Sequence, residues 1–287
     1  MKNNYEIYGE GKVDVVIEMG LGACMAEWEP FCKEVSKNHC VLVYERFGIG
    51  KSEESDKERT PENIADELYV LLNNVLRKDK ITLIGHSQGG LYAAYFATKH
   101  PELIEKLILV DPLSFKDNDF KNTLSENDYK KSGVDKSINF EIMRKLAKFK
   151  LGFVSQLAMK YAPPFCYYNF DKEQKESILD AYAKYSYANT SLMEYKSAHE
   201  EKNLELFHTD ISWNFPVVII THDSETAIKE SMEFGRNTYE FADRIEKMWQ
   251  NLMREYSRFS ENTIEVRATR SGHYIHLTEP EIIIDKI

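Results

Sequence analysis

The stretch Gly85-His86-Ser87-Gln88-Gly89 is the most informative part of the chain, because it lies between a predicted strand and a predicted helix. An apolar run at 81–84 precedes it, and a run rich in small residues at 90–97 follows it. A G-x-S-x-G sequence in this setting is typical of a sharp strand-to-helix turn that raises a serine hydroxyl above the edge of a sheet. Glycines are favoured beside such a serine, because side chains there would collide with neighbouring backbone. Ser87 is therefore a candidate nucleophile.

Strands and helices alternate at both ends of the chain. Apolar runs predict strands at 13–18, 41–44, 81–84, 107–110, 215–220 and 263–268. Thr60 precedes Pro61 and a set of apolar residues at helical spacing, which predicts a helix capped by Thr60. Thr278-x-x-Glu281 likewise predicts a capping box for the final helix. The alternation predicts an α/β fold with a mostly parallel sheet of about eight strands and helices on both faces.

The middle of the chain has a different pattern. Between 114 and 211 no strand is predicted, and short helical patterns are interrupted once by Pro163-Pro164. We expect this segment to be a helical cap above the carboxyl edge of the sheet. The predicted organisation is one core made of 1–113 and 212–287, interrupted by a cap insertion at 114–211.

Three further segments extend the pattern around Ser87. Met19-Gly20-Leu21-Gly22 follows the first predicted strand, the segment 44–52 (Tyr-Glu-Arg-Phe-Gly-Ile-Gly-Lys-Ser) closes the second, and Ser271-Gly272-His273 follows the last. Together these residues resemble the α/β-hydrolase superfamily, in its serine-hydrolase branch with a helical cap. The resemblance covers about the first 113 and the last 75 residues. Met19 stands where that family usually has a histidine, and Glu45 where it has an aspartate.

The resemblance implies that His273 is the catalytic base. His273 follows the last predicted strand, which agrees with the expected chain order of serine, acid and histidine. His276, three residues further on, is the competing candidate, and His86 matches a position that the resemblance marks as structural. The other histidines adjoin polar or loop residues and are expected to be solvated: His39, His100, His199, His208 and His222.

Two places compete for the acid that must orient the histidine and stabilise its protonated form. Some members of the family place it just after the strand before the cap, where this chain has Asp111. Many place it after the strand that follows the cap, where this chain has Asp223 and Glu225 but lacks the usual Gly-x-x-Asp form. We take Asp111 as the first candidate and Asp223 as the alternative, followed by Glu225.

The resemblance also implies an oxyanion hole made by the backbone N–H groups of Leu21 and Gln88. Gly20-Leu21 matches the family's oxyanion turn, and Gln88 opens the helix after the serine. Both donors belong to the backbone, so the identity of the side chain matters little. Removal of one such donor typically lowers turnover by ~10²–10³.

Two glycine patterns mimic nucleotide-binding loops and are incomplete. Gly50-Lys51-Ser52 lacks the P-loop glycine five positions earlier, where this chain has Glu45. Gly20-Leu21-Gly22 lacks the third glycine of a dinucleotide fingerprint, at the position of Met25. We therefore expect no nucleotide cofactor and no metal.

The composition is that of an ordinary globular protein. The chain has 287 residues, of which 43% are hydrophobic and 29% are charged. Its net charge of −10 disfavours nucleic acid and anionic membranes as partners, because both are negatively charged. The N-terminus lacks the apolar stretch of a signal peptide, and no apolar run approaches the ~20 residues that span a bilayer. The cysteines lack zinc-site spacing and are expected to be reduced thiols of a cytoplasmic protein: Cys24, Cys32, Cys40 and Cys166.

The predicted function is that of a serine hydrolase that cleaves a small carboxylic ester or related acyl compound through an acyl-enzyme on Ser87. We expect a monomer or homodimer whose partner is a small-molecule acyl substrate. The alternatives are an amidase or aminopeptidase, a lactonase, a carbon–carbon bond hydrolase, an acyltransferase, or a non-catalytic ligand-binding or receptor homologue, since the fold does not choose among them. A serine in place of an aspartate nucleophile argues against the haloalkane dehalogenase and epoxide hydrolase branches.

Overall fold

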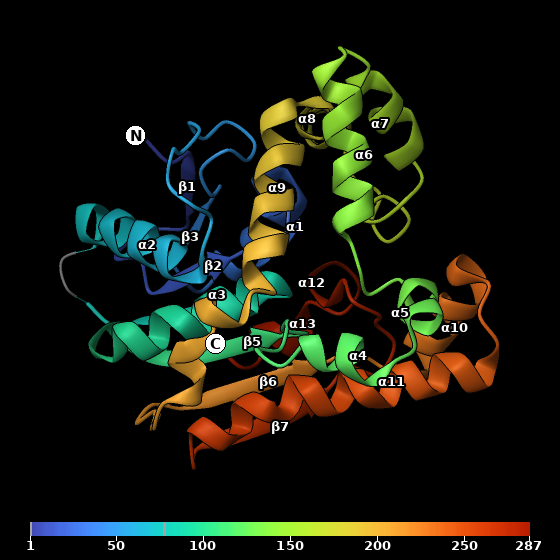
Figure 1. Ribbon diagram of the computed structural model, residues 1–287. Helices are drawn as coiled ribbons and strands as arrows, with labels where there is room; N and C mark the ends of the chain where they lie inside the picture. Colours follow the sequence, from blue (N-terminus) through green and yellow to red (C-terminus); the bar gives the residue numbers. More distant parts are fainter. Residues whose placement is uncertain (1, 77–78) are drawn as a thin grey trace.

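The central element of the structure, a computed structural model that describes residues 2–76 and 79–287, is a twisted sheet (Figure 1). Its seven strands follow the order β1-β3-β2-β4-β5-β6-β7, and all pairs are parallel except β1 with β3. The strands are β1 Tyr5–Tyr8, β2 Val15–Glu18, β3 Val41–Tyr44, β4 Ile81–His86, β5 Ile104–Val110, β6 Val217–Thr221 and β7 Thr263–Arg267. The predicted α/β class is confirmed, and the expected count of about eight strands is corrected to seven over the described residues.

The helices lie around this sheet. Those that cover it are α1 Met25–Val35, α2 Pro61–Val75, α3 Gln88–Lys99, α11 Tyr239–Met253, α12 Ile275–Thr278 and α13 Glu281–Ile284, and α10 Ser224–Gly235 follows β6. Those between β5 and β6 are α4 Asn118–Thr123, α5 Glu126–Ser132, α6 Ser137–Lys148, α7 Gly152–Met159, α8 Lys172–Ala183 and α9 Tyr185–Ala198. Short 3-10 turns occupy Pro101–Leu103, Glu201–Asn203, Glu205–His208 and Arg254–Phe259.

Two hydrophobic cores form on opposite faces of the sheet, because alternate residues of each strand point to opposite sides. On one face Leu83 and Leu109 pack with Leu68 of α2 and Phe96 of α3. The opposite face packs against a different set of helices, with Trp28 of α1 and residues of α12 and α13 in contact with the other strand residues. Burial on both faces explains why the central strands are continuous apolar runs.

The segment between β5 and β6 is helical throughout its regular structure. Figure 1 shows α6, α7 and α8 standing away from the sheet, with α9 leading from them back toward α2 and α3. The predicted helical insertion is therefore present. The ends of the segment pack into the main core, because Phe115 and Phe207 stack with their ring centroids 5.0 Å apart in the core that includes α2 and α3.

Of the two helix caps predicted from the sequence, one is confirmed and the other is wrong. The hydroxyl of Thr60 accepts a hydrogen bond from the N–H of Asn63 at 3.1 Å, so the predicted cap of α2 is confirmed. The predicted capping box at Thr278 is wrong, because Thr278 is the last residue of α12. Its hydroxyl donates to the carbonyl of Tyr274 instead.

The turn between β4 and α3 depends on two glycines that allow close packing. A Cβ atom on Gly85 would lie 2.6 Å from the Cβ of Ala93, and one on Gly89 would lie 2.3 Å from the carbonyl oxygens of Glu18 and Met19. The absence of these side chains lets α3 begin directly against β2 and β4. Ser87, at the tip of the turn, has φ 55° and ψ −128°, a conformation that non-glycine residues rarely adopt.

A buried cluster of charges connects the helical insertion to the sheet. Arg46, after β3, contacts Glu18 of β2 at 2.7 Å and Glu194 of α9 at 2.9 Å. Arg59 contacts Glu67 of α2 at 2.8 Å and the same Glu194 at 3.3 Å. All five side chains are buried, so each charge depends on its partners for the stabilisation that water would otherwise supply.

No helix in the described part of the chain is both long enough and apolar enough to cross a lipid bilayer.

We expect Gly89→Ala to destabilise the fold by about 2–3 kcal/mol, because the new methyl group overlaps two backbone oxygens that cannot move independently. The control is Gly133→Ala, where a Cβ would meet nothing within 4 Å. Since Gly133 has φ 72°, that control should lose about 1 kcal/mol through its backbone alone. Urea unfolding measures both losses, and equal losses would contradict the role assigned to the close packing.

We expect Glu194→Ala to lower the free energy of unfolding by about 3–5 kcal/mol, because it leaves Arg46 and Arg59 buried with an unbalanced charge. Glu141→Ala in the neighbouring helix α6 is the control, since Glu141 pairs with Lys196 at 3.0 Å on the exposed surface. That control should change little. A similar midpoint of urea unfolding for the two variants would show that the buried cluster does not hold the insertion in place.

Candidate active site

Four polar side chains meet at the carboxyl edge of the sheet. Ser87 follows β4, Asp111 follows β5, His222 follows β6, and His273 lies in the loop after β7. Ligands of parallel α/β sheets bind at this edge, because the loops after neighbouring strands converge there.

Ser87, His273 and Asp111 form a continuous chain of hydrogen bonds. The Oγ of Ser87 lies 3.0 Å from Nε2 of His273, and Nδ1 of His273 lies 2.6 Å from Oδ2 of Asp111. The carboxylate can only accept, so Nδ1 carries the proton and Nε2 is free to accept from the serine hydroxyl. Asp111 is buried, whereas Ser87 is partly exposed and the His273 side chain is 35% exposed. The hydroxyl and the imidazole can therefore be reached from outside while the acid cannot.

The structure separates the candidates for the acid. Asp111 contacts His273, whereas the carboxylate of Asp223 accepts from the N–H and hydroxyl of Thr226 at 2.8 and 2.7 Å and so caps α10. Glu225 lies on the exposed surface of the same helix. Asp111 also has φ 47°, a strained backbone conformation like that of Ser87. Of the three predicted acids, the structure brings only Asp111 to the histidine.

The two histidines near His273 have other surroundings. Nε2 of His86 donates to the carbonyl oxygen of His273 at 2.9 Å, which holds the loop that carries His273. Burial lowers the pKa of His86 to about 3, so this ring is neutral. His276 is buried and stacks on Trp28 at a centroid distance of 3.9 Å, and its ring nitrogens have no hydrogen-bond partner among the described residues. The geometry therefore favours His273 over His276.

His222 contradicts the expectation that it is solvated. Its side chain is buried, with Nδ1 2.7 Å from Oδ1 of Asp111 and Nε2 2.7 Å from Oε2 of Glu246 on α11. Burial would lower the pKa of His222, but the charges of Asp111 and Glu246 outweigh it and raise the pKa to about 10. The polar residues beside His222 in the sequence gave no sign of this burial. The signal that the sequence did offer was the place of His222 directly after a predicted apolar strand.

His199 is also less exposed than expected. Its Nε2 lies 3.0 Å from Oδ2 of Asp117, and its side chain is 13% exposed. This pair lies in the segment between β5 and β6, away from the Ser87 site.

The turn after β2 lies against Ser87. A Cβ on Gly20 would lie 3.3 Å from the Cβ of Ser87, so Leu21 follows directly beside the serine. Arg46 donates to the carbonyl oxygens of Met19 and Gly20 at 2.6 and 2.8 Å, and these two hydrogen bonds hold the turn in its conformation. The buried charge cluster is thereby connected to the predicted oxyanion turn.

The predicted oxyanion donors are available for a ligand. Neither the N–H of Leu21 nor that of Gln88 has a hydrogen-bond partner among residues 2–76 and 79–287. Gln88 is the first residue of α3, where backbone N–H groups lack partners within the helix and the helix dipole favours negative charge. Gln88 follows Ser87 in the chain, and Leu21 follows Gly20, which packs against Ser87.

The helical insertion lies directly over this turn. A Cβ on Gly22 would lie 2.6 Å from the hydroxyl of Tyr187 and 3.1 Å from Oγ of Ser191, both on α9. The Oγ of Ser191 is buried and has no protein partner in the described part of the chain. Polar groups of α9 therefore lie next to the Ser87 site.

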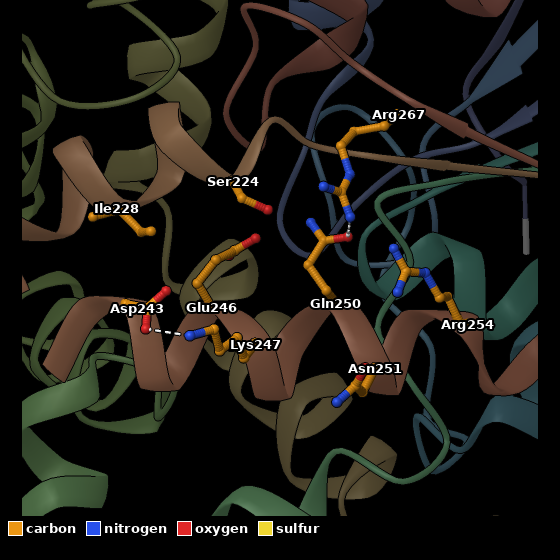
Figure 2. Close-up of a pocket in the computed structure, with 9 residues that line it drawn as sticks. All are labelled: Ser224, Ile228, Asp243, Glu246, Lys247, Gln250, Asn251, Arg254 and Arg267. Carbon is orange, nitrogen blue, oxygen red and sulfur yellow. Dashed lines mark hydrogen bonds and ion pairs between the residues drawn. The ribbon is translucent and has the colours of Figure 1, made fainter. Parts of the chain in front are cut away.

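A separate cavity of about 390 Å³ lies between α10, α11 and β7 (Figure 2). Its lining includes Glu246, Gln250 and Arg267 and none of Ser87, His273 and Asp111. Glu246 connects this cavity to the Ser87 site, because Glu246 lines the cavity and its Oε2 also contacts Nε2 of His222. Within the described ranges, no group of three or more His, Cys, Asp or Glu side chains has the arrangement to hold a metal ion.

Comparisons with known proteins agree with this fold. The family model described as the alpha/beta hydrolase fold matches residues 15–132. The chain is 32% identical over 111 residues to "Putative carbamate hydrolase RutD" of Pantoea ananatis, a match that covers 37% of this chain and 40% of that protein. It is 28% identical over 107 residues to "1-acylglycerol-3-phosphate O-acyltransferase ABHD5" of Rattus norvegicus, covering 36% and 30% of the two chains.

The matches to these curated relatives therefore span about two fifths or less of their length. A solved structure, epoxide hydrolase CorEH, superposes with a TM-score of 0.65 at 18% identity, covering 98% of this chain and 92% of that one. At that identity the likeness concerns the fold. The sheet order, the strand-turn-helix at Ser87, the helical insertion and the match over residues 15–132 lead to one conclusion: this chain has the alpha/beta hydrolase fold.

Proposed function

We propose that this protein is a serine hydrolase that cleaves a small carboxylic ester or related acyl compound through an acyl-enzyme on Ser87. The observation that carries the proposal is the hydrogen-bonded chain from Ser87 Oγ through His273 to Asp111. A serine hydroxyl is a weak nucleophile, and a base within hydrogen-bond reach that is itself oriented by a third group activates it.

Each residue of the chain has a defined role in the proposed reaction. The Oγ of Ser87 attacks the substrate carbonyl carbon, and its proton passes to Nε2 of His273. Asp111 holds Nδ1–H and stabilises the imidazolium that forms. The N–H groups of Leu21 and Gln88 stabilise the negative charge on the carbonyl oxygen. His273 then protonates the leaving group. In the second step His273 takes a proton from a water that attacks the acyl carbon, and returns it to the Oγ of Ser87 as the bond between Oγ and the acyl group breaks.

The electrostatics of Asp111 suit this role. Burial alone would raise the pKa of this carboxyl, but the charges and hydrogen bonds of His222 and His273 outweigh burial and hold the pKa well below its usual range. Asp111 therefore stays ionised at neutral pH. An ionised acid is required to accept from His273 and to stabilise its protonated form.

The substrate class follows from the nucleophile. A carbonyl carbon with a leaving group accepts attack by Ser87, and esters, lactones, amides and carbamates all provide one. The name of the RutD relative, which concerns carbamates, is compatible with this chemistry. The name of the ABHD5 relative concerns acyl transfer, which differs only in that an alcohol replaces water in the second step. Product analysis with added alcohols separates transfer from hydrolysis.

We expect a fluorophosphonate probe to label Ser87 in the wild-type protein, and His273→Ala to slow this labelling by about 10³-fold or more, because the serine loses its base. Intact mass and peptide sequencing measure the extent and position of the adduct. His276→Ala is the matched control and should label at close to the wild-type rate. Absence of an adduct on wild-type Ser87 would refute the proposed function and favour a non-catalytic binding protein.

We expect Asp111→Asn to lower the rate of labelling and of ester hydrolysis by up to about 10⁴-fold, because the amide no longer holds His273 in the required tautomer. Asp223→Asn is the control, since asparagine also caps helices well. The reverse pattern, a large loss in Asp223→Asn and none in Asp111→Asn, would overturn the assignment of the acid.

A further inference from the structure

His222 is the one buried histidine of the described chain that contacts the acid of the site without contacting Ser87 or His273. Its contacts leave Asp111 with little freedom. Oδ1 of Asp111 accepts from the ring Nδ1 of His222 at 2.7 Å and from the backbone N–H of His222 at 3.0 Å. Oδ2 alone remains for His273, at 2.6 Å. The carboxylate is thus held in the orientation that presents one oxygen to the catalytic base.

The second ring nitrogen of His222 indicates the charge of the ring. Nε2 lies 2.7 Å from Oε2 of Glu246, so both ring nitrogens face carboxylate oxygens. Ionised carboxylates have no proton to donate, and a ring that donates at both nitrogens is an imidazolium. The carbonyl of His222 also accepts from the side-chain amide of Gln250 at 3.2 Å, which fixes the residue to α11. Ring and backbone are therefore held independently.

The other groups around His222 are consistent with a positive charge. Asp111 faces it from the end of β5, Glu246 from α11, and the negative charge of Glu230 acts on it from α10. Trp249 of α11 presents its ring at a centroid distance of 6.2 Å. The ring of His273 contacts the other oxygen of Asp111, so Asp111 lies between the two rings.

We propose that His222 is a positioning residue of this site: as an imidazolium held between Asp111 and Glu246, it orients the Asp111 carboxylate and keeps it ionised. The proposal rests on the proposed function, since it assigns His222 a role in the activation of Ser87. A buried aspartate next to a neutral side chain would lose its charge more easily, because burial penalises the ionised form. A protonated Asp111 could neither hold Nδ1–H of His273 nor stabilise its imidazolium.

The test is the pH dependence of fluorophosphonate labelling of Ser87 in the wild type and in His222→Gln. Loss of the neighbouring positive charge raises the pKa of Asp111, so the carboxylate becomes protonated at higher pH and the acid limb of the labelling rate moves to higher pH. We expect a shift of at least about one pH unit and a slower rate at pH 6. If the labelling rate of a folded His222→Gln protein falls at the same acidic pH as that of the wild type, the proposal is overturned.

A matched control separates this effect from the loss of any buried histidine. His199→Gln removes a ring that pairs with Asp117 in the same way, outside the site. It should leave the acid limb where the wild type has it. An equal shift in His199→Gln would show that the effect is general and would also overturn the proposal.

A direct measurement of the ring charge does not depend on activity. In protein labelled with ¹⁵N-histidine, both ring nitrogens of His222 should show the protonated chemical shift from pH 6 to pH 9. The signal is assigned by its loss in His222→Gln, and Glu246→Gln should lower the pH at which the ring loses its proton, because one negative neighbour is removed. A neutral ring at pH 7 in the wild type overturns the proposal.

Failure of the inference and failure of the proposed function give different results. If wild-type Ser87 is not labelled, the proposed function fails and the activating role of His222 fails with it, whatever the NMR result. If wild-type Ser87 is labelled and the labelling rate falls at the same acidic pH in the wild type and in His222→Gln, only the inference fails. If His222→Gln does not fold, Glu246→Gln decides by NMR, and a ring titration that stays at the wild-type pH counts against the proposal.

Discussion

The parallel register of β4, β5 and β6 is the constraint on which the site depends. His86 pairs with Val110, and Val110 pairs with Ile220, so the three strands end at the same level. The next residues continue this arrangement, since Ser87 N–H donates to Val110 and Asp111 N–H donates to Ile220. A slip of one residue in a strand would turn its side chains to the opposite face and separate Ser87 from Asp111.

Strained backbone accompanies this register at two positions. Ser87 and Asp111 both have positive φ, at 55° and 47°, although neither is glycine. Such conformations cost about 1–3 kcal/mol each and persist only where surrounding structure enforces them. Here the enforcement comes from backbone hydrogen bonds to neighbouring strands and from the close approach of α3, which requires glycine at positions 85 and 89. The strain aims both side chains toward His273.

Buried charges are balanced on both sides of the serine. On one side Arg46, held by Glu18 and Glu194, contacts the turn that carries Leu21. On the other side Asp111 lies between two histidine rings. Removal of one partner from such a group leaves a buried charge uncompensated, which is more harmful than loss of the attraction alone. The helical insertion takes part in the first group through Glu194, so its position and that of the turn after β2 are linked.

Much of this architecture could be predicted from the sequence, because apolar runs and the G-x-S-x-G turn act locally. Local patterns of this kind were enough to predict the central strands, the turn at Ser87 and the cap of α2 by Thr60. It did not reveal β1, an exposed edge strand of four residues, or the burial of His222, whose local neighbours are polar. The contact of His273 with Asp111 and not with Asp223, and the place of His222 beside Asp111, could be found only in the folded structure, because both depend on which strand ends lie side by side.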